Sequence, residues 1–160
     1  MDYNRAVRDL NGKTTDQLLK ELEGDFTVEK APAPVKPAKL HEFGMYLDGH
    51  WYRLVSRPGT WREDPIGVLD VTILQEKLLH PLLCIGDPRT DHRIDFIGGI
   101  RGLGELERRV DHGDMAVAFS LHPVTIQQLF DIADSGEVMP PKSTWFEPKL
   151  RDGLLTHLID

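Results

Sequence analysis

The stretch FGMYLDGHWYRLV, residues 43–55, decides the fold class. Two runs rich in aromatic and aliphatic residues flank Asp48-Gly49, the pair that a two-residue type I′ turn favours. In the register set by this turn, Tyr46 faces Trp51, and aromatic cross-strand pairs of this kind stabilise a two-stranded ribbon. The sequence therefore predicts an antiparallel hairpin with a type I′ turn.

Before the hairpin, residues 1–30 are predicted to form a strand–helix–strand segment. Thr14 and Gln17 have the spacing of a capping box, and Gly24 follows the leucines of the helix as a left-handed stop. Residues 31–40 contain three closely spaced prolines, which favour an extended connector over helix or central strand. A Pro-x-x-Pro match in this connector leaves a role as a docking motif open beside the role of a spacer.

Residues 41–160 are expected to form the main α/β domain. A helix is predicted to begin at Asp70 as its cap and to end near His80, ahead of Pro81. The run MAVAFSL at 115–121 is almost continuously apolar, which is typical of a strand buried on both faces. We therefore expect a mixed α+β fold, in which a mixed sheet with flanking helices carries the antiparallel hairpin.

A second capping box, Thr125 and Gln128, begins the last helix that the sequence clearly predicts. Apolar side chains follow at helical spacing, including Ile126 and Phe130, and Gly136 ends the segment. The pattern predicts a helix with one apolar side.

Charge and composition limit the partners. The chain has 19 basic and 26 acidic residues, a net charge of −7, and no cluster of Lys and Arg that could neutralise a nucleic-acid backbone. No run of eighteen apolar residues is present, and the single cysteine, Cys84, cannot form an internal disulfide. We expect a cytoplasmic protein that binds neither nucleic acid nor membrane, and we leave a homodimer open.

The stretch GDPRTDHRID, residues 86–95, is the first candidate site. Asp87 and Asp91 alternate there with Arg89 and Arg93. Carboxylates beside arginines suit a metal-bridged phosphate site, in which the acids bind metal or act as general base. A charged turn explains the stretch equally well, because Asp-Pro and Thr-Asp are also good turn formers.

The stretch MPPKSTWFEPKL, residues 139–150, is the second and more unusual candidate. Its prolines stiffen the backbone around Lys142, Ser143, Thr144 and Lys149. Ammonium groups, hydroxyls and free N–H groups on a rigid loop are suited to recognising phosphate or carboxylate. The alternative is a surface loop that its aromatic residues anchor to the core.

Other candidate motifs are weaker. The glycines of GGIRGLG, residues 98–104, could receive an anion at a helix start, but their spacing fits no nucleotide-binding fingerprint and tight packing explains them as well. There is no nucleophile elbow. His112 and His122 lack the spacing of metal ligands, so we expect no protein-only metal site.

Several of these stretches resemble the bacterial domain-of-unknown-function 1015 family. They include DYNRAVRDLNG (2–12), HEFGMYLDGHWYRL (41–54), GDPRTDHRIDFIGGIRGL (86–103) and MPPKSTWFEPKLRDGL (139–154). The resemblance implies a cytoplasmic α/β protein related to the ParB/sulfiredoxin-like fold, some of whose members phosphorylate free serine. Family members are longer, so the chain would correspond to their C-terminal portion, without the family's histidine-rich stretch.

We therefore expect a domain that binds a small phosphorylated or carboxylate ligand and contributes to phosphoryl transfer on serine or phosphoserine. In this interpretation Lys142, Ser143, Thr144 and Lys149 bind the ligand, and Arg89 and Arg93 assist. The sequence identifies no cofactor, and Mg²⁺ and a nucleotide are the candidates for such a reaction. The alternative is a non-catalytic ligand-binding or dimerisation domain whose chemistry lies in the missing N-terminal half.

Overall fold

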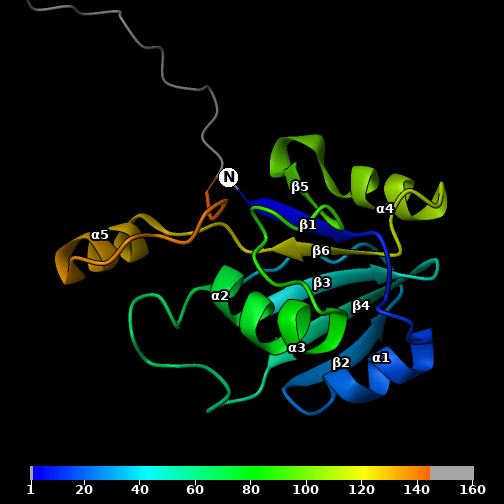
Figure 1. Ribbon diagram of the computed structural model, residues 1–160, viewed down its shortest axis with the longest axis horizontal. Helices are drawn as coiled ribbons and strands as arrows, with labels where there is room; N and C mark the ends of the chain where they lie inside the picture. Colours follow the sequence, from blue (N-terminus) through cyan, green and yellow to red (C-terminus); the bar gives the residue numbers. More distant parts are fainter. Residues whose placement is uncertain (1, 145–160) are drawn as a thin grey trace, which may run out of the picture.

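The protein, described by a computed structural model over residues 2–144, is built on one six-stranded sheet (Figure 1). The strands are β1 (Tyr3–Val7), β2 (Phe26–Ala31), β3 (Glu42–Leu47), β4 (His50–Ser56), β5 (Ile94–Gly98) and β6 (Val117–Leu121). The helices are α1 (Thr15–Leu22), α2 (Asp70–Leu74), η1 (Gln75–Leu79), α3 (His80–Leu83), η2 (Gly99–Arg101), α4 (Leu103–Asp111) and α5 (Ile126–Ser135). The expected mixed α+β class is confirmed, with strand order β2-β4-β3-β6-β1-β5.

Each strand pair within residues 2–144 is antiparallel, and the predicted hairpin lies near the middle of the sheet as β3 and β4. Tyr46 lies opposite Trp51, as predicted, with ring centroids 5.3 Å apart. The turn residues Asp48 and Gly49 have φ values of 50° and 73°. Positive φ at both positions is what a type I′ turn requires.

The first thirty residues form the predicted strand, helix and strand, but the two strands do not pair with each other. β1 lies between β6 and β5, whereas β2 lies beside β4 at the opposite edge. Residues 1–30 thus contribute to the same sheet as the chain that follows the connector. The run at 115–121 supplies β6, which lies between β3 and β1 and is buried along its whole length, as predicted.

The proline-rich connector packs against the sheet. Val35 and Pro37 are buried, and the Ser120 hydroxyl donates a hydrogen bond to the Val35 carbonyl at 2.7 Å. Gly44 lies beneath this contact, where a Cβ atom would collide with the Val35 carbonyl and the Ser120 hydroxyl. Because Pro37 is buried, the Pro-x-x-Pro segment cannot present both prolines to a partner without leaving the sheet.

Apolar side chains cover both faces of the sheet. On one face, α1 and the segment α2–η1–α3 pack through leucines such as Leu18 and Leu78 against strand residues such as Phe119. On the other face, α4 and the connector pack through Leu106 and Val35. Within the described residues, no helix has the length and apolar character needed to cross a membrane.

The helix predicted to stop near His80 continues to Leu83, so that expectation was wrong. Its middle turn, Gln75–Leu79, is a π-helix, and Pro81 falls inside the next turn rather than after the helix. Proline lacks an N–H donor and crowds the preceding turn, and here the preceding turn is the π-helix. The segment ends at Cys84, which is left-handed with φ 54°.

Asp70 is the first residue of α2, but its carboxylate caps no N–H of the helix. The carboxylate accepts the backbone N–H of His41 instead.

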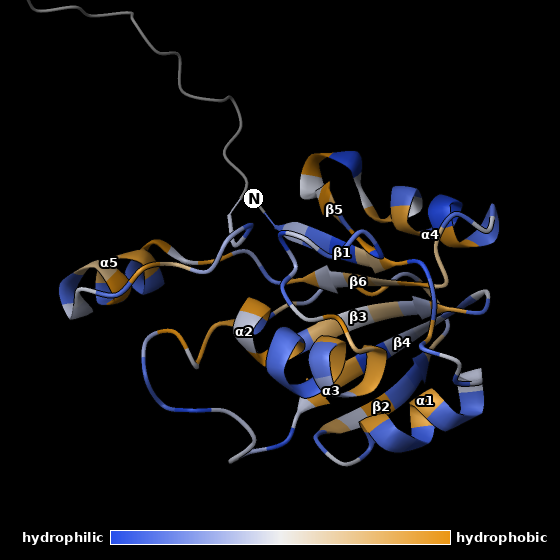
Figure 2. Ribbon diagram, in the orientation of Figure 1, coloured by the Kyte–Doolittle hydropathy of each residue, from blue (hydrophilic) through white to orange (hydrophobic). Residues whose placement is uncertain are grey.

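Both predicted capping boxes form, at Thr14 and Thr125. Gly136 ends α5 in the left-handed conformation, as expected, whereas α1 ends at Glu23 in a right-handed one and needs no left-handed glycine. The apolar side of α5 is largely uncovered, since Ile126 and Phe130 are 70% and 60% exposed. Figures 1 and 2 show α5 projecting from the sheet with apolar residues along it.

Candidate functional site: a pocket beside a buried arginine

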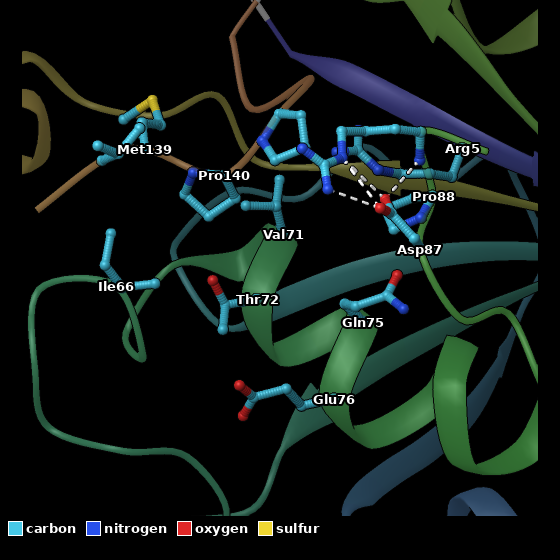
Figure 3. Close-up of a pocket in the computed structure, with 13 residues that line it drawn as sticks. Arg5, Ile66, Val71, Thr72, Gln75, Glu76, Asp87, Pro88, Met139 and Pro140 are labelled. Atoms are coloured by element: carbon cyan, nitrogen blue, oxygen red, sulfur yellow. Dashed lines mark hydrogen bonds and ion pairs between the residues drawn. The ribbon is translucent and has the colours of Figure 1, made fainter. Parts of the chain in front are cut away.

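The two sequence motifs meet beside β1. Asp87 and Arg89, from the loop before β5, and Pro140, from the segment after α5, line one cavity of about 500 Å³ together with Arg5. The other lining residues are Ile66, Val71, Thr72, Gln75, Glu76, Pro88, Val138, Met139 and Pro141. Segments far apart in the sequence are thus brought to a single site (Figure 3).

Arg5 is the most unusual residue of this pocket. It lies in the middle of β1, directly between Phe96 on β5 and Phe119 on β6, and only 4% of its surface is exposed. Its guanidinium donates to the carbonyl of Lys142 at 2.7 Å and to that of Tyr3, and it lies 5.0 Å from the ring centroid of Phe96. Within residues 2–144 no carboxylate forms an ion pair with it.

This environment leaves a buried positive charge uncompensated. Burial lowers the pKa of Arg5 to about 9, so the guanidinium is still charged at neutral pH. Taking an ion out of water costs several kcal/mol unless a partner of opposite charge is supplied. A bound anion would supply that partner, and Arg5 is therefore the clearest indication of a ligand in the described chain.

Helix residues complete the lower wall of the pocket. Thr72 is buried, and its hydroxyl oxygen has no hydrogen-bond partner among residues 2–144. Gln75 donates from its amide to the carbonyls of Ile85 and Gly86, at 2.8 and 2.9 Å. Gln75 thus holds the start of the 86–95 loop against the helix, while Thr72 lines the cavity with its hydroxyl oxygen buried.

The Asp87 carboxylate is already paired. Arg89 donates to both of its oxygens, with Nε 3.0 Å from Oδ1 and Nη2 2.7 Å from Oδ2. This pairing lowers the pKa of Asp87 to about 2. A carboxylate with so low a pKa is a weak proton acceptor at neutral pH, so the geometry favours Asp87 as an anchor for Arg89 over a general base.

The second acid–arginine pair of this loop faces another direction. Asp91 accepts from Arg93 at 2.9 Å, and the pairing lowers the pKa of Asp91. Arg93 also donates to the carbonyls of Leu83 and Cys84, at 3.2 and 2.5 Å. Arg93 therefore satisfies the C-terminal end of α3 and is absent from the lining of the Arg5 pocket.

A second hollow, of about 440 Å³, adjoins the first through Arg89, which lines both. Its charged and titratable lining residues are Arg8, Arg89, Asp91, His92, Asp95 and Lys142. The ammonium group of Lys142 lies 5.9 Å from the ring centroid of Phe96 and 6.0 Å from that of Tyr3. The predicted residues Arg89, Asp91 and Lys142 are thus neighbours around one hollow.

The remaining predicted ligand residues are placed less favourably. The Ser143 hydroxyl is buried and donates to the Pro140 carbonyl at 2.6 Å, which closes the turn of the loop. Thr144 is half-buried and lines neither hollow. Lys149 lies outside the described residues.

The glycine-rich turn has a structural explanation. A Cβ atom at Gly99 would collide with the carboxylate of Asp2, so a larger residue there would have to displace that side chain. Gly102 has φ 72° at the start of α4, a conformation that glycine adopts without strain. Across residues 2–144, no group of three or more His, Cys, Asp or Glu side chains has the arrangement of a metal site.

Sequence reasoning missed Arg5 and Thr72. Arg5 lies in the pattern YNRAV, where Tyr3, Arg5 and Val7 share one face of the strand. An arginine on the same face as two large apolar residues is the signal that could have identified it, because that face is expected to be buried.

The comparisons with known proteins give a family and no function. No curated protein matches the chain, and no solved structure matches it, so the expected relationship to the ParB/sulfiredoxin-like fold stays a prediction. Residues 1–72, which include Arg5 and Thr72, match a family model described as "Protein of unknown function (DUF1015)". This match over residues 1–72, a little under half of the chain, supports membership of the DUF1015 family.

Proposed function

We propose that this protein binds a small phosphorylated or carboxylate ligand in the pocket beside Arg5. The observation that carries the proposal is a charged guanidinium, almost fully buried and without a carboxylate partner in the described residues, on the wall of a cavity of about 500 Å³. An anion in that cavity would offset the desolvation of Arg5. Arg89 adds a second positive group at the same wall.

Phosphoryl transfer on serine or phosphoserine is the finer form of this proposal. It requires a group that accepts or delivers a proton, or a metal held near the phosphate. Around the Arg5 pocket the carboxylates are Asp87, paired with Arg89, and Glu76, paired with Arg62 at 2.8 Å. Because both carboxylates are already paired, ligand binding without catalysis is the second function that we propose.

Calorimetric titration with inorganic phosphate, phosphoserine and serine tests the binding proposal. We expect phosphate and phosphoserine to bind and serine to bind at least tenfold more weakly. The variant Arg5→Met replaces the guanidinium with an apolar chain of similar length and should abolish binding. Lys30→Met, at an exposed position on the edge strand β2, is the matched control and should bind as the wild type does.

The stability of the Arg5→Met variant to urea distinguishes a ligand-binding role of Arg5 from a structural role. Because a buried charge without a partner costs several kcal/mol of desolvation, removing it in Arg5→Met should leave the urea midpoint at the wild-type value or higher. A folded Arg5→Met protein that still binds phosphate with wild-type affinity would refute the proposal. Phosphate release from phosphoserine, with and without Mg²⁺ and ADP, then tests the catalytic form.

A further inference from the structure

The Arg5 pocket is divided into a charged end and an apolar end. Figure 3 shows Arg5, Asp87 and Gln75 on one side of it, and Ile66, Val71, Met139 and Pro140 toward the other. The charged end is fixed by hydrogen bonds, since Arg5 is held by the Lys142 carbonyl and Gln75 by the carbonyls of Ile85 and Gly86. Glu76 also lines the pocket, below Thr72 in Figure 3, and its carboxylate is paired with Arg62 at 2.8 Å.

The apolar end has no function if the ligand is as small and polar as phosphoserine. A cavity of about 500 Å³ would hold roughly seventeen water molecules at about 30 Å³ each, more space than a phosphate on a three-carbon amino acid fills. Ligand sites combine an apolar lining with a few fixed polar groups, which orient the ligand. Here the fixed polar groups are gathered at one end.

From this division we propose, building on the proposed anion site, that the natural ligand is amphipathic. Its anionic group lies at Arg5 and Arg89, and an apolar body of aliphatic or aromatic carbon extends along Val71, Ile66 and Met139.

Binding of a homologous series of free alkyl phosphates, measured by calorimetry below their micelle concentrations, tests this inference. The series is inorganic phosphate, ethyl phosphate, butyl phosphate and hexyl phosphate. Because each buried methylene contributes about 0.8 kcal/mol, affinity should rise about fourfold for each added methylene until the apolar end is filled. Hexanol, which lacks the anionic group, should bind far more weakly than hexyl phosphate.

A pair of variants locates the effect. Met139→Gln changes a half-buried residue of the apolar end and should flatten the dependence on chain length while leaving the affinity for inorganic phosphate unchanged. Ile100→Gln changes an exposed apolar residue remote from the pocket lining and should alter neither.

The outcomes separate the two proposals. If inorganic phosphate binds through Arg5 but chain length has no effect, the amphipathic ligand is refuted and the anion site stands. If no phosphate in the series binds, or if hexanol binds as well as hexyl phosphate, the anion site itself is refuted. Binding to vesicles that contain phosphatidic acid, without binding to the free alkyl phosphates, would refute a small ligand held inside the pocket.

Discussion

Replacing Asp70 with asparagine removes a carboxylate from the buried start of α2. Asp70 is 5% exposed, and one of its oxygens accepts the His41 backbone N–H at 2.8 Å. The other oxygen has no hydrogen-bond partner in the part of the chain that the structure describes. Burial raises the pKa of Asp70 from 3.8 to about 7. In the unfolded chain the Asp70 carboxylate ionises near pH 4. At any higher pH, folding must therefore either protonate this carboxylate or remove its negative charge from water.

The sign and size of the effect follow from this shift. A group whose pKa is raised by folding stabilises the protein fully below its unfolded pKa, and that stabilisation is lost as pH rises toward the folded pKa. The shift is about three pKa units, and at about 1.4 kcal/mol for each unit the loss between pH 4 and pH 8 is roughly 4 kcal/mol. Asp70→Asn retains an oxygen acceptor for His41 but carries no charge, so it avoids this loss.

Urea unfolding followed by circular dichroism, at half-unit steps from pH 4 to pH 8, measures the difference. The free energy of unfolding of Asp70→Asn relative to the wild type should increase by roughly 4 kcal/mol across the range, with most of the change complete by pH 7. Asp134→Asn, at an exposed position on α5, should run parallel to the wild type and serves as the control. If the Asp70→Asn and wild-type profiles are also parallel, the assignment of Asp70 as a buried acid that titrates near neutrality is refuted.

Three further substitutions test the packing, each by urea unfolding against the wild type. Gly44→Ala should cost about 1–3 kcal/mol or more, because the added methyl displaces the Val35 carbonyl from Ser120; no loss would show that the connector is not held there. Thr14→Ala removes the capping box of α1 and should cost about 1 kcal/mol, and an unchanged midpoint would contradict the cap. Phe130→Ser, at a 60% exposed position on α5, should change stability by no more than about 0.5 kcal/mol; a large loss would show that this side chain is covered.

The parts of the fold that depend on neighbouring residues could be predicted from the sequence. A few consecutive residues determine the turn at Asp48-Gly49 and the capping boxes at Thr14 and Thr125. All three form as predicted. The position of β1 between β6 and β5 depends on pairing across about ninety or more residues, which no local pattern specifies.

The candidate site was only partly predictable for the same reason. The alternation of carboxylates with arginines predicts Arg89 as a site residue, and the polar donors on a proline-stiffened loop predict Lys142. The structure places both around one hollow. Arg5 was missed because the charge of a strand arginine suggests exposure, and only its strand neighbours show that it is buried. The left-handed Cys84 and the inclusion of Pro81 in a helix depend likewise on the π turn before them.

The central claim is that a small anion binds at Arg5. A crystal structure of the protein with selenate, a phosphate analogue located by its anomalous scattering, tests this claim most directly. We predict an anomalous peak within hydrogen-bonding distance of the Arg5 or Arg89 guanidinium, absent in crystals of Arg5→Met. Selenate found only at other positions, with the cavity beside Arg5 holding nothing but water, would contradict it.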